Sequence, residues 1–81
     1  MVMTKEMQFK TIAAQYCRVK PEEMENNMRF REDLGFSSLD FMAFLGELED
    51  TFDIELEEED ALQVLTVGEA LALMERLQQE A

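Results

Sequence analysis

Two adjacent serines, Ser37 and Ser38, follow Gly35 and precede a stretch with helical periodicity, which places them at the predicted start of a helix. Ser37 and Asp40 match a capping box, in which each side chain accepts a backbone N–H of the other residue. Ser38 then takes the first helical position, where its hydroxyl is exposed. A phosphate attached there would face free backbone N–H groups and the positive end of the helix dipole. The pattern predicts helix caps at Ser37 and Asp40 and a modification site at Ser38.

The composition excludes most other chemistry. The chain has no His and one Cys, so it cannot form a Ser-His-Asp triad, a Cys-His pair, a zinc knuckle or an internal disulfide. The twelve-residue calcium loop needs Gly at its sixth position, but counting from Asp33 gives Ser38 and counting from Asp53 gives Glu58. We therefore predict no catalytic residue, no metal ligand and no enzyme. Cys17 is expected to be a small buried apolar residue in a protein of the reducing cytoplasm.

Charge defines the class of partner. The 81 residues contain 19 Asp and Glu against 7 Lys and Arg, for a net charge of −12, and no Lys or Arg lies between Glu32 and Glu75. This charge repels phosphate backbones and anionic lipids, which argues against nucleic acid and favours a protein partner with a basic patch. No apolar run approaches the ~18 residues of a membrane span. We expect a monomer.

The segments between turn signals predict an all-α fold. We expect a first helix over about Thr4 to Cys17, a short turn at Pro21 to Glu23, and a long loop over 25–35 pinned by Met28, Phe30 and Leu34. The apolar residues of the first helix fall on one side, which is expected to form a wall of the core; these are Phe9, Ile12, Ala13 and Tyr16. Three more segments complete the prediction: a helix from Ser37 to about Asp53, one or two turns over Glu57 to Leu62, and a last helix that begins at the Thr66-Glu69 capping box and runs to about Gln79. Residues 1–81 are thus predicted to form a single domain, a small four-helix bundle with a short third helix and a long loop between helices one and two.

The second predicted helix has two distinct sides. One side carries apolar residues at helical spacing and faces the core; these are Phe41, Phe44, Leu45, Leu48 and Phe52. We expect the core to include Phe30, Leu34, Leu56, Val64, Val67, Ala70 and Met74 as well, with Ala61 and Leu62 of the short helix facing inward. The opposite side carries Leu39, Met42, Ala43, Gly46, Glu49, Asp50 and Asp53.

That opposite side is predicted to be a docking surface for partner proteins. Gly46 in mid-helix costs about 1 kcal/mol relative to Ala, so its presence favours a role in close approach of another backbone. The neighbouring acids would steer a basic partner. The acidic run from Glu57 to Asp60 is either part of this surface or a solvated face without a partner.

Three segments, in order, resemble the acyl carrier protein family. They are Asp33-Leu34-Gly35-Phe36-Ser37-Ser38-Leu39-Asp40, then Leu48-Glu49-Asp50-Thr51-Phe52-Asp53-Ile54-Glu55-Leu56, then Thr66-Val67-Gly68-Glu69-Ala70. The resemblance implies that Ser38 carries a 4′-phosphopantetheine arm derived from coenzyme A, with acyl groups held as thioesters on its thiol. It further implies a phosphopantetheinyl transferase as a partner, together with acyl-loading and acyl-transfer enzymes.

One residue departs from the family pattern, which usually has Asp where this chain has Ser37. As a helix cap the exchange is nearly neutral, but it removes a charge that a transferase reads. Fatty acid, polyketide and related specialised biosynthesis all stay open as the pathway. The alternative from a different class is an unmodified acidic helical adaptor that binds a basic protein, and the intact mass of the protein from its own host discriminates between the two.

Overall fold

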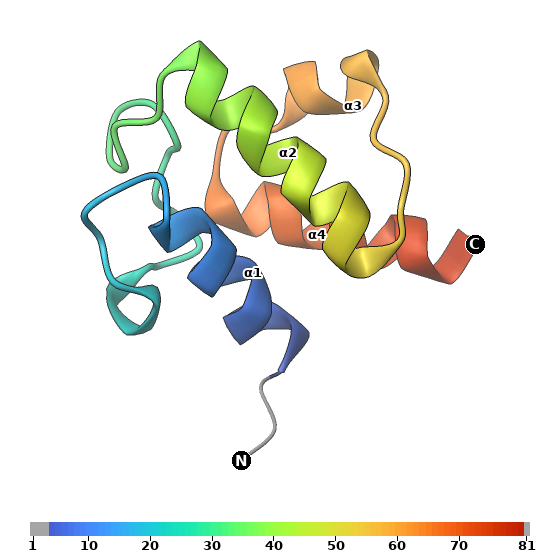
Figure 1. Ribbon diagram of the computed structural model, residues 1–81, viewed down its shortest axis with the longest axis horizontal. Helices are drawn as coiled ribbons and strands as arrows, with labels where there is room; N and C mark the ends of the chain where they lie inside the picture. The colour runs from blue at the N-terminus through green and yellow to red at the C-terminus, as the bar shows by residue number, and fades with distance from the viewer. Residues whose placement is uncertain (1–3, 81) are drawn as a thin grey trace.

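The computed structural model describes residues 4–80, and these form four α-helices and one short 3-10 helix (Figure 1). The helices are α1 (Lys5–Ala14), α2 (Ser38–Phe52), α3 (Glu58–Gln63) and α4 (Val67–Glu80), and the 3-10 helix η1 covers Pro21–Glu23. A long loop joins η1 to α2. The predicted fold class, a small all-α bundle with a short third helix, is confirmed.

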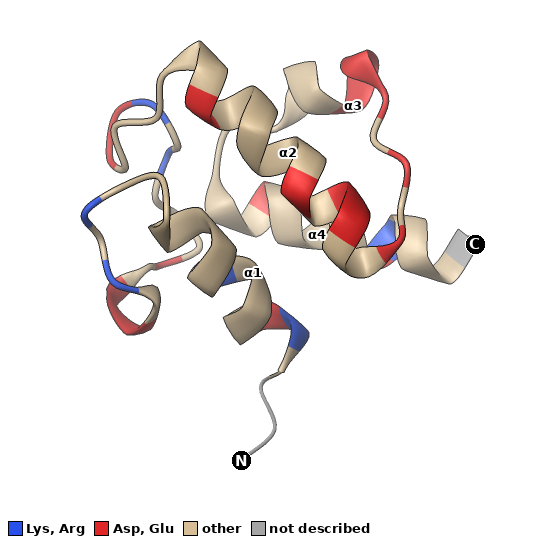
Figure 2. Ribbon diagram, in the orientation of Figure 1, with Lys and Arg blue, Asp and Glu red and all other residues tan. Residues whose placement is uncertain are grey.

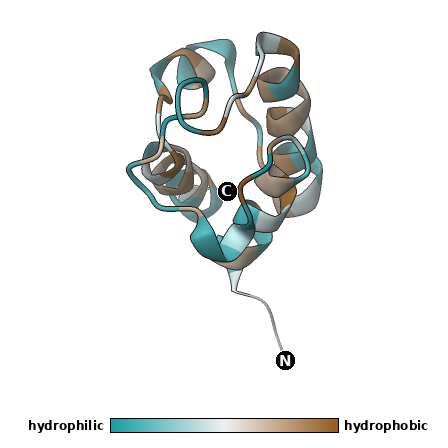
Figure 3. Ribbon diagram, turned by 90° about the vertical axis from the view of Figure 1, so that its left-hand side faces the viewer, coloured by the Kyte–Doolittle hydropathy of each residue, from teal (hydrophilic) through white to brown (hydrophobic). Residues whose placement is uncertain are grey.

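A single hydrophobic core joins the helices and the long loop. Seen from the side in Figure 3, the helices surround a common interior. Phe44 of α2 lies at its centre, with ring centroids 5.3 Å from Phe9, 5.5 Å from Phe30 and 5.6 Å from Phe36. Such edge-on and tilted ring pairs add specific packing energy to the burial of their area. The aromatic rings therefore fill the space under the first half of α2.

Most of the expected core residues are buried, but the expected list was incomplete. Phe41, Phe52 and Leu56 are only partly buried, at the edge of the core. Four buried residues were not predicted, and they are Met24, Phe36, Ile54 and Leu71. Leu62 was predicted to face inward and this is wrong, since 75% of its surface is exposed. Adjacent residues of a helix point about 100° apart, so Ala61 packs against the core while Leu62 points to solvent.

The first helix is shorter than predicted. It ends at Ala14, with Gln15 as C-cap, rather than at Cys17. Beyond that point Tyr16 donates a hydrogen bond to Glu47 of α2 and packs its ring against Phe36 and Phe44. These tertiary contacts replace the last helical turn. Cys17 lies in this irregular segment and is partly rather than fully buried.

The long loop is fastened to the start of α4 by backbone hydrogen bonds. Phe30 N–H donates to Leu65 O at 3.1 Å, Val67 N–H to Met28 O at 3.0 Å, and Gly68 N–H to Asn26 O at 2.8 Å. Gly68 permits this approach, because a Cβ there would lie 3.1 Å from Asn26 O. The loop therefore has a defined path to the N-terminus of α2.

The helices of residues 4–80 are too short or too polar to span a bilayer.

Candidate functional site

The capping box at the start of α2 has the predicted reciprocal geometry. Asp40 N–H donates to Ser37 Oγ at 3.1 Å, and Ser37 N–H donates to Asp40 Oδ2 at 3.1 Å. Ser37 has an extended backbone conformation, whereas Ser38 begins the helix. The two adjacent serines therefore have different surroundings, and only the Ser38 side chain is free of the cap.

Ser38 is exposed, and its hydroxyl has one partner that the sequence did not reveal. Arg31 Nη2 donates a hydrogen bond to Ser38 Oγ at a distance of 2.6 Å. A guanidinium has no acceptor atom and keeps its positive charge in proteins, so Arg31 cannot remove the proton of the hydroxyl. It can stabilise negative charge on or next to the Ser38 oxygen.

A turn in the long loop brings Arg31 back to α2. Phe36 N–H donates to Phe30 O at 2.8 Å, and both side chains are buried with their ring centroids 5.2 Å apart. Gly35, with φ of 76°, adopts the left-handed conformation that this turn requires. Arg31 directly follows one anchor and Ser38 lies two residues after the other. The only sequence signal for their contact is that Arg31 is the last cation before the acidic stretch.

The geometry at Ser38 fits a phosphate ester. The hydroxyl is accessible, and helix geometry leaves the first amides of α2 without acceptors inside the helix. Arg31 supplies a positive charge at the oxygen itself. A pocket of about 200 Å³ opens next to Arg31, and Phe30, Phe41, Val64 and Leu65 form its apolar walls. The residues present can thus hold an anionic group next to an apolar surface.

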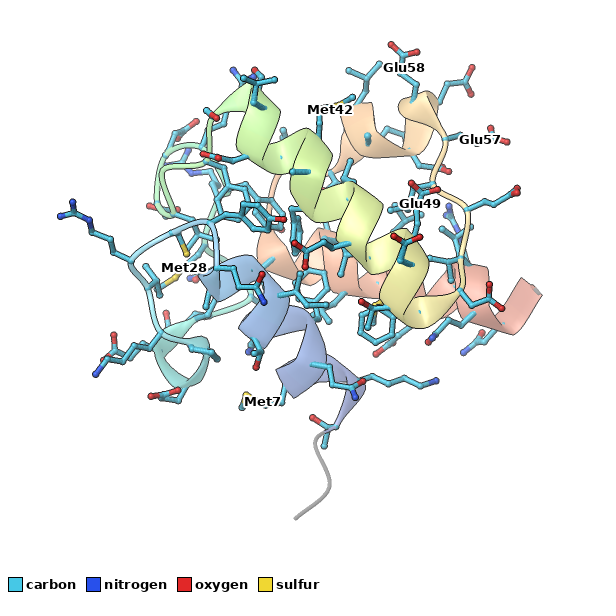
Figure 4. The ribbon with its side chains drawn as sticks, viewed as in Figure 1. Met7, Met28, Met42, Glu49, Glu57 and Glu58 are labelled. Carbon is cyan, nitrogen blue, oxygen red and sulfur yellow. The ribbon has the colours of Figure 1, made fainter. Side chains whose placement is uncertain are left out.

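The predicted docking surface is exposed over part of its area. Leu39 and Met42 are 82% and 68% exposed, and Ala43, Asp50 and Asp53 are also exposed. Gly46 and Glu49 are half-buried because they line a groove of about 370 Å³ between α2 and α3. Figure 4 shows Met42 and Glu49 on the α2 side of this groove and Glu57 and Glu58 at the start of α3.

Glu49 also has a structural contact. Its Oε2 accepts the backbone N–H of Leu56 at 3.1 Å, which fastens the α2–α3 loop to the last turn of α2. Asp53, at the C-cap of α2, has φ of 53° and therefore adopts the left-handed conformation. Substitutions that break the Glu49 hydrogen bond or cannot adopt the left-handed conformation at position 53 would alter the local backbone as well as the charge, so tests of docking need substitutions that keep this geometry.

Acidic side chains gather around this part of the molecule. In Figure 2 the Asp and Glu positions of this part lie on α2, along the α2–α3 loop and at the start of α3, and others lie on the long loop and η1, while the Lys and Arg positions lie on the long loop, around α1 and on α4. Among the described residues, ion pairs join Lys10 to Glu6, Arg29 to Glu32 and Asp33, and Arg76 to Asp60. The acids of the second half of α2 have no place in these pairs. This surface is suited to a partner of positive charge.

Tyr16 titrates abnormally because of its contact with α2. The hydrogen bond from its hydroxyl to the Glu47 carboxylate raises the pKa of Tyr16, and burial and the charges of Glu47 and Asp40 raise it further. The neutral phenol keeps the bond, whereas a phenolate would face a carboxylate. The hydrogen bond that joins the segment after α1 to α2 therefore forms only while the Tyr16 phenol is neutral.

Comparisons with known proteins agree with this geometry. The family model described as "Phosphopantetheine attachment site" matches residues 8–80. The chain is 35% identical over 68 residues to an acyl carrier protein of Sulfurovum sp., covering 84% of this chain and 91% of that one. It is 36% identical over 66 residues to an acyl carrier protein of Wolinella succinogenes, covering 82% and 87%. A solved acyl carrier protein from Enterococcus faecalis superposes with a TM-score of 0.78 at 26% identity, covering 89% of this chain and 91% of that one.

Proposed function

This chain belongs to the acyl carrier protein family, and we propose that Ser38 is the residue to which its 4′-phosphopantetheine arm is attached. The members of this family are carriers and not enzymes, and the arm supplies a terminal thiol that holds acyl groups as thioesters. The observation that carries the assignment is the exposed Ser38 hydroxyl, which lies at the N-terminus of α2 with a guanidinium on its oxygen.

The attachment reaction needs a transferase to supply a base, since among the described residues the hydrogen-bond partner of the Ser38 hydroxyl is Arg31, which can only donate. Its Oγ attacks the phosphorus of coenzyme A that bears the pantetheine, and a phosphodiester bond to Oγ forms. The bond from that phosphorus to the departing adenosine bisphosphate breaks. The partner that the structure gives the hydroxyl is a donor, so the proton must pass to a base of the transferase. This chain presents and orients the oxygen.

Loading tests the assignment directly. The protein is incubated with coenzyme A, magnesium and a broad-specificity phosphopantetheinyl transferase, and its intact mass is measured. We expect one phosphopantetheine on the parent and on Ser37→Ala, and none on Ser38→Ala. Loading of Ser38→Ala would contradict the proposal. An unloaded protein from its own host that no transferase modifies would favour the unmodified acidic adaptor.

We propose that partner enzymes with basic patches dock on the side of α2 formed by Leu39, Met42, Ala43, Gly46, Glu49, Asp50 and Asp53. Support comes from the exposure of Leu39 and Met42 next to Ser38 and from the acids that follow on the same helix. In this arrangement the apolar residues set the lifetime of the complex and the acids set its rate of formation.

Binding kinetics of the unloaded carrier with its transferase, and of the loaded carrier with an acyl-loading enzyme, test this surface. Asn tolerates the left-handed conformation, so Asp53→Asn removes the charge without straining the C-cap. The double variant Asp50→Asn, Asp53→Asn should associate several-fold more slowly at low salt and show a weaker salt dependence. The control is Glu22→Gln, Glu75→Gln, which removes the same charge from exposed positions on η1 and α4. Equal slowing in both variants would contradict the placement.

We further propose that residues 1–81 act as one acyl carrier-like domain and as a monomer. We place it in the cytoplasm, where a lone thiol such as Cys17 stays reduced.

The cargo of the carrier belongs to fatty acid, polyketide or related specialised biosynthesis. Ser37 in place of the usual Asp favours the specialised case, because it alters the charge that the housekeeping enzymes of the family meet.

A further inference from the structure

Arg31 stands out among the cations because of where its charge lies. Its Nη2 reaches Ser38 Oγ at 2.6 Å across seven residues of sequence. The anchors of this contact are rigid, since Phe30 and Phe36 are buried and joined by a 2.8 Å backbone hydrogen bond. The loop therefore presents Arg31 to the start of α2 as a feature of the fold.

The carboxylates nearest in sequence already have other partners. Glu32 and Asp33 both pair with Arg29, and Asp33 Oδ2 also accepts Arg29 N–H at 2.7 Å. Asp40 accepts the N–H of Ser37. Among the residues that the structure describes, the ion pairs of the long loop join Glu32 and Asp33 to Arg29, and the guanidinium of Arg31 lies at the serine oxygen.

Attachment of the arm changes what Arg31 meets. The serine oxygen becomes part of a phosphodiester, which places a negative charge on the phosphorus group bonded directly to Ser38 Oγ. A guanidinium already at that oxygen is within reach of the phosphate oxygens, and Arg pairs with phosphate through two parallel hydrogen bonds. The first turn of α2 favours the same charge.

We propose that Arg31 is a positioning residue that pairs with the phosphodiester and fixes the root of the arm, an inference that rests on the attachment to Ser38 proposed above. The residue before Ser38 supports the assignment. An Asp at position 37, as in the usual family pattern, would place a carboxylate beside the guanidinium and compete with the phosphate, whereas Ser37 caps the helix without competing. Ser37 and Arg31 thus act in the same direction.

Phosphorus NMR of the loaded protein tests the pairing at its own atom. The parent, Arg31→Gln, Arg31→Lys and Arg29→Gln are each loaded, and intact mass confirms one arm on each. We expect Arg31→Gln to shift and narrow the phosphodiester resonance, because the root of the arm gains freedom. Arg31→Lys should give an intermediate resonance, since it keeps the charge and loses the two-pronged geometry. Added salt should move the parent resonance toward that of Arg31→Gln.

Two controls separate the pairing from general effects. Arg29→Gln removes an equal charge two residues away, and because Arg29 pairs with Glu32 and Asp33 it should leave the phosphorus resonance in place. Ser37→Asp should shift the parent resonance toward that of Arg31→Gln. In NMR spectra of the parent protein, the side-chain N–H signals of Arg31 should shift between the unloaded and the loaded form.

Two results would contradict the role of Arg31, and a third would contradict the attachment to Ser38 as well. The same phosphorus resonance in loaded parent and Arg31→Gln, or Arg31 side-chain signals that do not change on loading, would overturn the role of Arg31 while leaving Ser38 as the attachment site. A parent protein that gains no mass would overturn the proposed function and this inference with it.

Discussion

At the level of single residues, Ser37 and Ser38 show how the backbone assigns different roles to identical side chains. Ser37 is in the extended conformation and its hydroxyl accepts the Asp40 N–H, so it is occupied by the helix. Ser38 is one residue further, inside the helix, and its hydroxyl meets Arg31 and solvent. The two serines are chemically identical, and their positions relative to the helix give them their different roles.

Removal of the cap should cost stability without preventing loading. Ser37→Ala leaves the Asp40 N–H without its acceptor, and we expect the free energy of unfolding to fall by about 1 kcal/mol. Ser37→Asp restores an acceptor, so its free energy of unfolding should lie within ~0.5 kcal/mol of that of the parent, because Ser and Asp cap equally well. Urea unfolding of the three proteins measures the difference. Equal stability of Ser37→Ala and the parent would show that the cap contributes nothing.

The local rules explain why the capping box was predictable from the sequence and the Arg31 contact was not. Ser37 and Asp40 are three residues apart, and helix geometry alone brings them together. Arg31 reaches Ser38 through a turn closed by buried Phe30 and Phe36, and Phe36 has no periodic neighbours that would mark it as core. A contact that depends on two tertiary anchors leaves no spacing to recognise.

At the level of elements, tertiary contacts decide where the helices end and what they face. The periodicity of α2 and its capping residues were sufficient to predict its start and its core side. The end of α1 was missed because Tyr16 leaves the helix for its contacts with Glu47, Phe36 and Phe44. The prediction for Leu62 was wrong because one turn of helix does not show from its sequence which of the neighbours Ala61 and Leu62, about 100° apart, faces the core. Local pattern predicted these elements and the bounds of α2, α3 and α4 to within about one residue, but not the end of α1 or the direction of Leu62.

The Tyr16–Glu47 contact predicts loss of stability at high pH. The pKa of Tyr16 is raised in the folded protein, chiefly by its hydrogen bond to Glu47, so the unfolded chain ionises first, near its ordinary value of about 10. The stabilisation is therefore complete below pH ~10 and is lost as pH rises through the folded pKa. Tyr16 is the one tyrosine of a chain without Trp, so its ultraviolet absorbance reports its titration alone.

The matched variant for this titration is Tyr16→Phe, which keeps the ring and removes the phenol. We expect the unfolding free energy of the parent to fall relative to that of Tyr16→Phe as pH rises above about 10. A parent phenol that titrates at its ordinary value in the folded protein would contradict the coupling between α1 and α2.

Gly46 separates the stability of α2 from its proposed use as a docking surface. A Cβ at this position meets no atom within 4 Å outside its own helix, so Gly46→Ala should stabilise the fold by about 0.5–1 kcal/mol. Ala43→Gly, at an exposed position on the same helix, should destabilise it by a similar amount. Thermal or urea unfolding measures both changes. If Gly46 serves close approach of a partner, Gly46→Ala should also dissociate faster from the loading enzyme, and unchanged dissociation would contradict that role.

At the level of the whole molecule, the distribution of charge links stability to partner binding. The segment from Glu32 to Asp60 holds 12 acids and no Lys or Arg, and the ion pairs of the described residues involve only Glu32, Asp33 and Asp60 of this segment. The other carboxylates repel one another across α2, the following loop and α3 (Figure 2). The same repulsion that weakens the isolated fold would be relieved by a basic partner.

Salt should therefore stabilise the free protein at neutral pH. Screening at ~0.15 M ionic strength acts on charges more than about 8 Å apart, which is the range of the repulsion between exposed carboxylates on different turns and elements. We expect the melting temperature at pH 7 to rise as salt is added from a low-salt buffer. The double variant Asp50→Asn, Glu55→Gln removes two exposed charges from this surface and should melt higher at low salt and respond less to added salt. The control Glu22→Gln, Glu75→Gln removes the same charge elsewhere and should keep most of the parent's response. A melting temperature that does not change with salt, or an equal response in both double variants, would show that repulsion between these carboxylates does not destabilise the fold. The acidic residues would then affect only the binding of partners.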